Sequence, residues 1–544
     1  MFKSQSSTRR RTLAGLIAGA ALAGLLIPTT VEARPGQNAC ERRNNNQYDK
    51  LLDCVTLAGV REHQAAFQAI ADANGGTRAD QTPGYAASVD YVESTMRAAG
   101  WDVAVVPFVY QEEVGDLVQL TPAPPATYET GGYTGSAIAQ AQAAVVPVDI
   151  NLIPPRASTS GCDGAFAETA VGAPLLPDPG GPNDFAGFPA GAIALIQRGG
   201  CSFALKAHNA EAAGASGVII FNQGNTPDRE PLFIGSAVAP AGSAVGALTI
   251  PVVGASFADG SALARPGSTA RIEVRLEDRF SENVIAEKQG VNDDNVVMAG
   301  AHLDSVPAGP GINDNGSGSA ALLEVAQNLA NHRPRNTLRF AWWGAEELGL
   351  LGSTAWVNER SEAELDEIAL YLNFDMVGSP NYFIGVYDAD ESSYDAPVAV
   401  PDGSIAIEDV FESYYTLVDE PYDDTEFSGR SDYQAFINND IPSSGLFTGA
   451  EVLKNAEQAG IWGGTVGAQF DPCYHLVCDT LANNSDHALD VNSDAIAFAV
   501  LTFAYSTESV NGVQGSRVPG GGALPAPAGP EGTCPAGPTV PCKL

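Results

Sequence analysis

A histidine and an aspartate that can take part in metal binding follow a predicted buried strand. The strand covers residues 296–301, and His302 and Asp304 come after it with one residue between them. Because successive side chains of an extended chain point to opposite faces, this spacing places both on one face at the strand end. Histidine is a common metal ligand, and a neighbouring carboxylate can fix its tautomer. The pair therefore indicates a metal site.

Four more carboxylates lie in loops next to neighbouring predicted elements. Asp314 lies in a loop rich in glycine and asparagine that opens a helix, where an aspartate could also be an ordinary helix N-cap. Glu346 and Glu347 follow the next strand, and Asp375 follows the strand after that. In open α/β sheets the functional crevice lies beyond the carboxyl ends of the strands, so we expect these side chains to converge there with His302.

A cluster of this many carboxylates needs a positive charge. Like charges in close contact repel or raise one another's pKa values, and the motifs that carry these residues contain almost no lysine or arginine. Metal is the natural counter-charge, and two zinc ions per chain are the simplest solution. Adjacent glutamates point in different directions at a strand end, so one of Glu346 and Glu347 can bind metal while the other acts as a base.

The elements that must position these residues alternate between strand and helix from residue 283 onward. This alternation is typical of a doubly wound, mostly parallel α/β sheet. Two further helices are expected between residues 60 and 100. The predicted strands of the alternating region cover 295–301, 337–343 and 368–374, and its helices cover 318–330 and 349–358.

Composition divides the chain into segments. Near residue 116 proline, alanine and glycine become frequent, and short apolar strands between turns predict a β-rich insert over residues 116–275. The α/β domain is then split into residues 40–115 and 276–510. The uncharged stretch 233–258 is expected to form buried strands. Residues 511–544 are rich in proline and glycine and should be mostly irregular.

The N-terminus predicts export. Residues 1–33 combine basic residues, an apolar segment too short to span a membrane, and small residues at a cleavage site, as in a signal peptide. We therefore expect a secreted protein. Eight cysteines fit an oxidising compartment. Their positions suggest four pairs, which are Cys40 with Cys54, Cys162 with Cys201, Cys473 with Cys478, and Cys534 with Cys542.

The charge balance excludes some partners. The 544 residues include 65 aspartates and glutamates against 28 lysines and arginines, which gives a formal net charge of −37. Such a surface repels phosphate backbones and anionic lipids, so neither nucleic acid nor membrane is an expected partner. We expect a monomer.

Four separated motifs resemble metallopeptidase family 28, the co-catalytic zinc exopeptidases, and most of all their secreted bacterial leucyl aminopeptidases. The motifs are AHLDSVPAGPGINDNGSGSAALLE from Ala301, WWGAEELGLLGS from Trp342, NFDMVGSPN from Asn373 and CYHLVCDT from Cys473. The insert, with ALIQRGGCSF and AGASGVIIFN, resembles a protease-associated domain. In that insert His208 is expected at the surface.

The resemblance implies a ligand set. One zinc ion would be bound at His302 and Asp375, and the other at Glu347 and His475, with Asp314 bridging the two. It also implies that the peptide bond from Asp314 to Asn315 is cis.

The resemblance further implies catalytic roles for three residues. Glu346 would be the general acid and base, and Asp304 would support His302. Tyr474 would donate a hydrogen bond to the oxyanion of the tetrahedral intermediate. A disulfide between Cys473 and Cys478 would restrain the loop that carries Tyr474.

Four positions match the family's pocket for an apolar N-terminal side chain: Met376, Gly429, Arg430 and Phe447. Tyr433 departs from the family pattern, which has histidine there.

Some relatives also bind calcium through a pair that matches Asp490 and Asp494. The third position of that site falls on Cys54, with Asp53 beside it, and is not clearly matched.

The resemblance therefore implies a zinc aminopeptidase that prefers apolar N-terminal residues. A carboxypeptidase or another amidohydrolase with the same ligands is the alternative among enzymes. A non-catalytic receptor or scaffold is the alternative outside that class, although all five ligand positions and Glu346 are present. Carboxypeptidases normally hold the substrate carboxylate with arginine or lysine, and the metal motifs here contain neither.

Overall fold

The computed structural model describes residues 40, 42–178, 180, 183–533 and 542–543. The expected signal peptide and Cys534 lie outside this part of the chain. Three of the expected disulfides are present, joining Cys40 to Cys54, Cys162 to Cys201 and Cys473 to Cys478.

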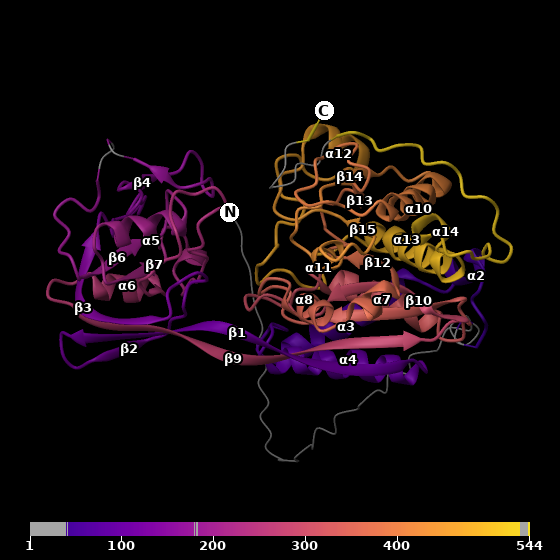
Figure 1. The fold of residues 1–544 in the computed structure, drawn as a ribbon, viewed down its shortest axis with the longest axis horizontal. Coiled ribbons are helices and arrows are strands. Elements are labelled where there is room, and N and C mark those ends of the chain that lie inside the picture. Colours follow the sequence, from indigo (N-terminus) through magenta and orange to yellow (C-terminus); the bar gives the residue numbers. More distant parts are fainter. Residues whose placement is uncertain (1–39, 41, 179, 181–182, 534–541, 544) are drawn as a thin grey trace, which may run out of the picture.

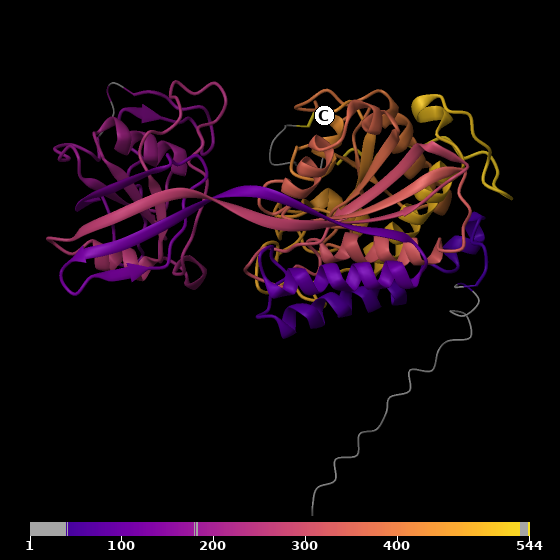
Figure 2. The ribbon, with the colours of Figure 1, turned by 60° about the horizontal axis from the view of Figure 1, so that its bottom comes forward.

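Two lobes are joined by a pair of long antiparallel strands (Figures 1 and 2). β1 (Asp102–Thr121) and β9 (Thr269–Lys288) run from one lobe into the other without a break. The expected domain boundaries at residues 116 and 275 fall inside these strands, and their placement stays a prediction.

The larger lobe contains a mixed, mostly parallel sheet, which confirms the predicted fold class. Its strands follow the order β14, β13, β15, β12, β10, β11, β9, and β10 is parallel to both β11 and β12. The predicted alternating elements are all present within three residues of their expected ends. The bounds are β10 Asn292–His302, β11 Asn336–Trp343, β12 Ile368–Phe374, β13 Gly385–Tyr387, β14 Asp423–Thr425 and β15 Ser443–Phe447.

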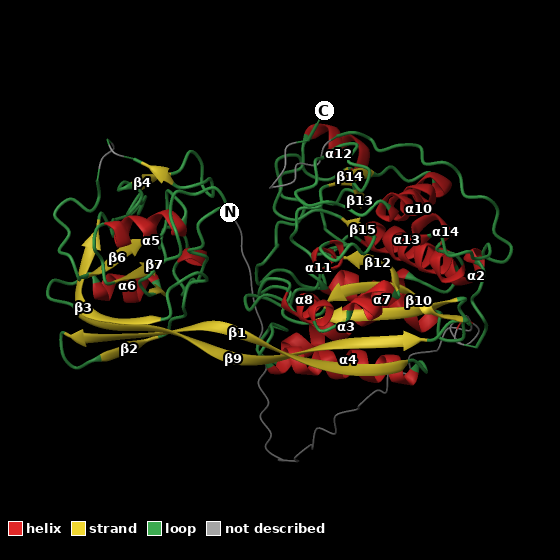
Figure 3. Ribbon diagram, viewed as in Figure 1, coloured by secondary structure: helices red, strands yellow, loops and turns green. Residues whose placement is uncertain are grey.

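Helices cover both faces of this sheet because its strands carry apolar side chains on both faces (Figure 3). On β11, Phe340 and Trp342 belong to one core cluster, and Ala341 and Trp343 belong to another. α8 and α11 supply residues to the second cluster, and most of the other helices pack into the first. The helices of this lobe are α2 Tyr48–Leu52, α3 Leu57–Ala73, α4 Pro83–Ala98, α7 Gly316–Asn328, α8 Leu351–Asn358, α9 Glu362–Asp366, α10 Gly403–Val418, α11 Tyr433–Ile437, α12 Ala456–Trp462, α13 Asp486–Tyr505 and α14 Glu508–Asn511.

Local signals explain where the two predicted N-terminal helices begin. The hydroxyls of Thr56 and Thr82 cap α3 and α4, and Pro83 occupies the first turn of α4, where its missing N–H does no harm. In the described part of the chain, α13 alone is long and apolar enough to cross a membrane. It is mostly buried in the core, as expected of a core helix.

The smaller lobe contains parallel strands and two helices. β3, β6, β7 and β8 pair in that order, and β3 also pairs with β9. The bounds here are β2 Ala126–Tyr128, β3 Ala139–Val148, β4 Phe166–Ala167, β5 Leu176–Pro177, β6 Ile193–Gln197, β7 Gly217–Phe221, β8 Val252–Ala255, α5 Phe203–Ala212 and α6 Phe257–Leu263.

One expectation about this lobe holds only for β8, and another is wrong. Between residues 233 and 251 the chain forms no strand, and only β8 follows, because the prolines and glycines of this stretch interrupt any ladder. His208 is buried, because α5 is covered on nearly all sides and each of residues 204–210 is buried.

The C-terminal segment from residue 512 to 533 is irregular, as predicted, and lies against the larger lobe. Its anchors include the backbone N–H groups of Gly532 and Thr533, which donate to the Asp423 carboxylate.

Candidate active site

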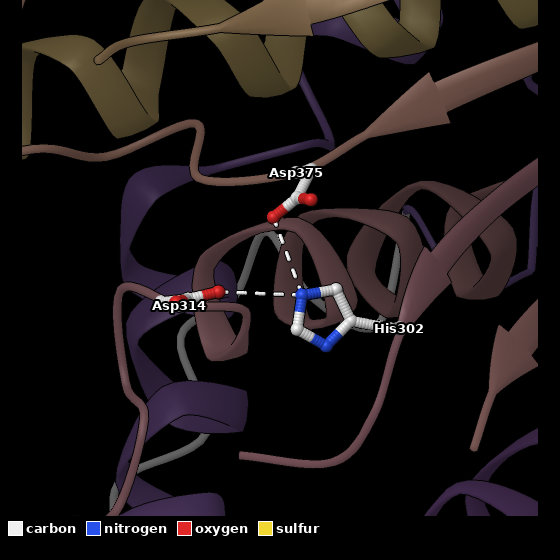
Figure 4. A group of neighbouring side chains, drawn as sticks. All are labelled: His302, Asp314 and Asp375. Carbon is white, nitrogen blue, oxygen red and sulfur yellow. Dashed lines mark ion pairs between the residues drawn. The ribbon is translucent and has the colours of Figure 1, made fainter. Parts of the chain in front are cut away.

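The ends of β10, β11 and β12 bring three of the predicted ligands, His302, Glu347 and Asp375, to one edge of the sheet. His302 ends β10, and Asp375 follows β12 directly. His302 Nε2 lies 3.3 Å from Asp314 Oδ1 and 3.3 Å from Asp375 Oδ1 (Figure 4). Since the three ligand atoms lie within 4.8 Å of one another, a single metal ion can contact all of them.

A second group shares Asp314 with the first. His475 Nε2 lies 3.1 Å from Asp314 Oδ2 and 3.0 Å from Glu347 Oε2. Asp314 therefore presents one oxygen to each histidine. This is the arrangement that a carboxylate bridging two metal ions requires.

Asp304 organises the loop after β11. Its carboxylate accepts the backbone N–H of Glu346 (3.1 Å) and of Glu347 (3.2 Å). His302 Nδ1 donates to the backbone carbonyl of Asp304 at 3.1 Å, and the Asp304 carboxylate lies further away, at 3.6 Å. The carbonyl thus fixes the histidine tautomer, and Nε2 is left facing the ligand carboxylates.

Two residues without a predicted role, Asp479 and Arg78, hold the loop that carries Asp314. The Asp479 carboxylate accepts the backbone N–H groups of Asn313 (2.8 Å) and Asp314 (3.0 Å). Asp479 is the second-last residue of the quoted motif that begins at Cys473, so the sequence contained a signal for its place near the site. Buried Arg78, which had none, donates to the carbonyls of Pro310 and Gly311.

Asn315, and not Asp314, is the N-cap of α7. The Asn315 side chain accepts the N–H of Gly318 and caps α7, so the Asp314 carboxylate stays free for the site. The peptide bond between Asp314 and Asn315 is cis, as the resemblance implies.

The electrostatics favour a cation between these side chains. Burial lowers the pKa of His475, but its contacts with Asp314 and Glu347 outweigh this and raise the pKa to about 10. Burial and the neighbouring Asp314 raise the pKa of Glu347 to about 7. Burial also raises the pKa of Glu346 well above its ordinary range.

Buried carboxylate oxygens without hydrogen bonds also indicate that a cation binds here. Glu347 Oε1 and Asp375 Oδ1 accept no hydrogen bond. Histidine nitrogen and carboxylate oxygen are ligands that zinc takes in catalytic sites. The residues present therefore fit zinc.

Three residues at the site have left-handed backbone conformations, which non-glycine residues adopt rarely. Ala345 (φ 53°) precedes Glu346, Met376 (φ 54°) follows Asp375, and His475 has φ 57°. Such residues cluster at functional sites, where the surrounding structure holds them.

Tyr474 lies over the site on a disulfide-closed loop. Its ring stacks on His475 with centroids 3.9 Å apart, and Cys473 and Cys478 close the loop. Its hydroxyl accepts a hydrogen bond from Arg430 Nη2 at 3.1 Å, and Arg430 Nη1 donates to Glu451 at 2.8 Å. The proton of the hydroxyl remains available for a further acceptor.

Replacing Tyr474 with phenylalanine is expected to lower kcat by about 10- to 10³-fold with little change in KM, because one donor to the developing oxyanion is lost. Steady-state kinetics on leucyl-p-nitroanilide measure this. Glu451→Gln is the matched control, since it keeps the tyrosine hydroxyl and a polar partner for Arg430. An unchanged kcat in Tyr474→Phe would contradict the role.

A pocket opens beside the ligands. Of the four predicted pocket residues, Met376, Arg430 and Phe447 line it, and Gly429 does not. The backbone N–H of Gly429 instead donates to the hydroxyl of Tyr433, at 2.8 Å. Lining residues that the sequence did not suggest include Phe383, Tyr387, Val452, Phe470, Glu426 and Glu451.

Ser431, which lies in a stretch that matches the family but had no predicted role, is a further neighbour of the site. Its hydroxyl donates to Asp375 Oδ2 at 2.7 Å, which orients the carboxylate so that Oδ1 faces His302.

The family model described as "Peptidase family M28" matches residues 283–500, and the one described as "PA domain" matches residues 142–263. An "Aminopeptidase" of Pseudomonas aeruginosa is 46% identical over 472 residues, which cover 85% of this chain and 83% of that protein. "Leucine aminopeptidase 2" of Trichophyton rubrum is 44% identical over 349 residues, or 61% of this chain and 68% of that one.

Solved structures are similar as well. "BSAP, a zinc aminopeptidase from Bacillus subtilis", aligns with a TM-score of 0.58 at 25% identity and covers 84% of this chain and 97% of its own. The aminopeptidase from Aneurinibacillus sp. strain AM-1 aligns with a TM-score of 0.54 at 25% identity, and the alignment covers 88% of this chain and 98% of that one. With the site geometry and these similarities together, the chain belongs to peptidase family M28 and carries an inserted PA domain.

Proposed function

We propose that this protein is an exported aminopeptidase that uses two zinc ions to hydrolyse the first peptide bond of peptides with apolar N-terminal residues. The observation that supports this most is the position of Asp314, which lines a partly apolar pocket. Its carboxylate belongs to two groups of candidate ligands, each of which contains one histidine and one further carboxylate. The relatives named aminopeptidases agree with this class of reaction.

The two groups would each hold one zinc ion. His302 and Asp375 belong to one, Glu347 and His475 to the other, and Asp314 to both. Zinc in such a site acts as a Lewis acid and lowers the pKa of water.

Glu346 would move the proton. It is buried and lines the pocket. Its Oε2 lies 3.8 Å from His302 Nε2, whereas the oxygens of Asp314 and Asp375 lie 3.3 Å from the same nitrogen. A carboxylate in this position can take a proton from the attacking water and give it to the leaving amine. Tyr474 would donate its hydroxyl proton to the oxyanion, and Arg430 holds that hydroxyl in place.

The charges of the pocket favour a free N-terminus over a C-terminus. Arg430 is the only lysine or arginine among the lining residues of the described chain, and it is already paired with Glu451. A carboxypeptidase would need a free cation to hold the substrate carboxylate. A substrate ammonium group instead meets carboxylates, while Met376 and Phe447 offer apolar surface for a side chain.

Leucyl-p-nitroanilide and leucyl peptides are therefore expected to be cleaved, and N-acetylation of the same peptides to abolish cleavage, because it removes the ammonium charge and adds bulk. Product analysis by mass spectrometry identifies the residue released. Equal rates on acetylated and free peptides, with release of the C-terminal residue, would favour the carboxypeptidase alternative. Absence of any hydrolysis by zinc-loaded protein would favour a receptor or scaffold.

We also propose that the protein is exported and monomeric. A relative in Mycobacterium tuberculosis, 42% identical, is named a probable lipoprotein aminopeptidase, which supports export.

A calcium ion bound at Asp490 and Asp494 is a further part of the proposal. Burial and Asp490 raise the pKa of Asp494 to about 7, so this pair would accept a cation, but the Cys54 side chain is in a disulfide and offers no carboxylate as a third ligand. Calcium binding at Asp490 is therefore the least supported part.

A further inference from the structure

A second cluster of buried carboxylates lies beside the pocket and takes no part in the site described above. Glu408 and Glu412 are one turn apart on α10, and Asp424 is on β14. One carboxylate oxygen from each lies within 4.8 Å of the other two. The residues are 4%, 8% and 1% exposed. We call them the second carboxylate cluster.

Two of its members have carboxylate oxygens without a hydrogen bond although the residues are buried. Glu412 forms no hydrogen bond or ion pair with any residue that the structure describes. Asp424 Oδ1 accepts no hydrogen bond, while Asp424 Oδ2 accepts the hydroxyls of Ser392 and Ser393. Burial raises the pKa of Glu408 to about 10, of Glu412 to about 8 and of Asp424 to about 6, so without a cation the two glutamates hold protons at neutral pH. A bound cation would replace those protons and give the unpaired oxygens a partner.

The third member is fixed in place by backbone groups. Glu408 Oε2 accepts the N–H groups of Ala389 and Asp390, both at 3.1 Å. These bonds hold the loop after β13 against α10. Asp388 and Asp390 of that loop also place carboxylate oxygens within 4.8 Å of one from Glu408.

No protein cation pairs with the cluster in the part of the chain that the structure describes. Lys543 pairs with Asp395, at 2.8 Å, and not with Glu408, Glu412 or Asp424. Protein cations therefore do not neutralise the cluster.

The donor set selects the kind of ion. All available ligand atoms are oxygens, with no histidine or cysteine, which disfavours zinc. Calcium takes six to eight oxygen ligands in a flexible geometry, whereas magnesium needs a near-ideal octahedron and keeps its water. We propose that the second carboxylate cluster binds one calcium ion through Glu408, Glu412 and Asp424.

The position of this ion would connect it to the pocket wall. Tyr387 directly precedes Asp388, Thr425 directly follows Asp424, and both line the pocket. The two are also register partners on the parallel strands β13 and β14. An ion that joins α10 to β14 would stabilise this wall of the pocket without touching the reacting atoms. Its loss should therefore raise KM and lower Tm, and it should change kcat little.

The test uses zinc-loaded full-length protein dialysed against calcium-free buffer that contains zinc. Isothermal titration with CaCl2 is expected to show binding with a Kd on the order of 10⁻⁴ to 10⁻³ M or tighter, as in calcium modules outside the cell. Tm should rise with calcium concentration, because a ligand that binds the folded state stabilises it. The same concentration of MgCl2 should raise Tm less.

Glu412→Gln and Asp424→Asn keep the side-chain shapes and are expected to remove this binding and the calcium-dependent rise in Tm. Asp494→Asn is the matched control, because it neutralises the other acidic pair, and calcium binding by the cluster should persist in it. The proposal is overturned if wild-type protein shows neither heat nor a Tm shift, a result that needs no variant. It is also overturned if Glu412→Gln binds calcium as wild type does, or if Asp494→Asn abolishes all binding.

Discussion

Replacing Glu346 with glutamine is expected to lower kcat by at least about 10²-fold, and by up to about 10⁴-fold, while the protein keeps both zinc ions. The amide has nearly the same shape as the carboxylate but cannot accept a proton from water. Because Glu346 is not among the closest ligand groups, its loss should leave metal content unchanged. Steady-state kinetics and elemental analysis of the purified protein measure the two effects.

Glu347→Gln is the matched control, since it makes the same change at the adjacent residue. Glu347 Oε2 lies 3.0 Å from His475 Nε2, so this variant should lose bound zinc as well as activity. If Glu346→Gln lost zinc and Glu347→Gln kept it, the ligand and the base would have been assigned in reverse.

Replacing Asp314 with asparagine is expected to reduce bound zinc from two ions to one or none and to abolish activity. The two carboxylate oxygens face different histidines, and asparagine keeps only one of them while its NH2 group, a donor, takes the other place. The zinc content after dialysis, followed by the activity after zinc is added back, measures this loss.

Asp479→Asn provides a graded comparison, because Asp479 holds the Asp314 loop through two backbone N–H groups and is not itself a ligand. Loss of an outer partner of this kind typically weakens metal affinity by about 10- to 100-fold. Asp479→Asn should therefore regain two zinc ions at high zinc concentration, and Asp314→Asn should not. Two tightly bound zinc ions in Asp314→Asn would contradict the bridging role.

The sequence by itself determined the elements and the strand-end residues of the site. His302 and Asp375 adjoin strands whose apolar runs are local signals, and neighbouring parallel strands end at one edge of a sheet, so their convergence followed from pattern alone. The capping threonines and Pro83 likewise fix helix starts through local hydrogen bonding. The motifs then supplied the roles of more distant residues by resemblance.

Only the tertiary structure decided contacts that depend on distant segments. Nothing local indicates that Arg78 donates to the carbonyls of the Asp314 loop, or that the Asp304 carbonyl, and not its carboxylate, is the closer partner of His302 Nδ1. The burial of His208 and the irregular chain before β8 likewise depend on what packs against them. Periodicity reports which face of an element is apolar, but the partner of a polar atom is set by whichever segment folding brings within hydrogen-bond distance.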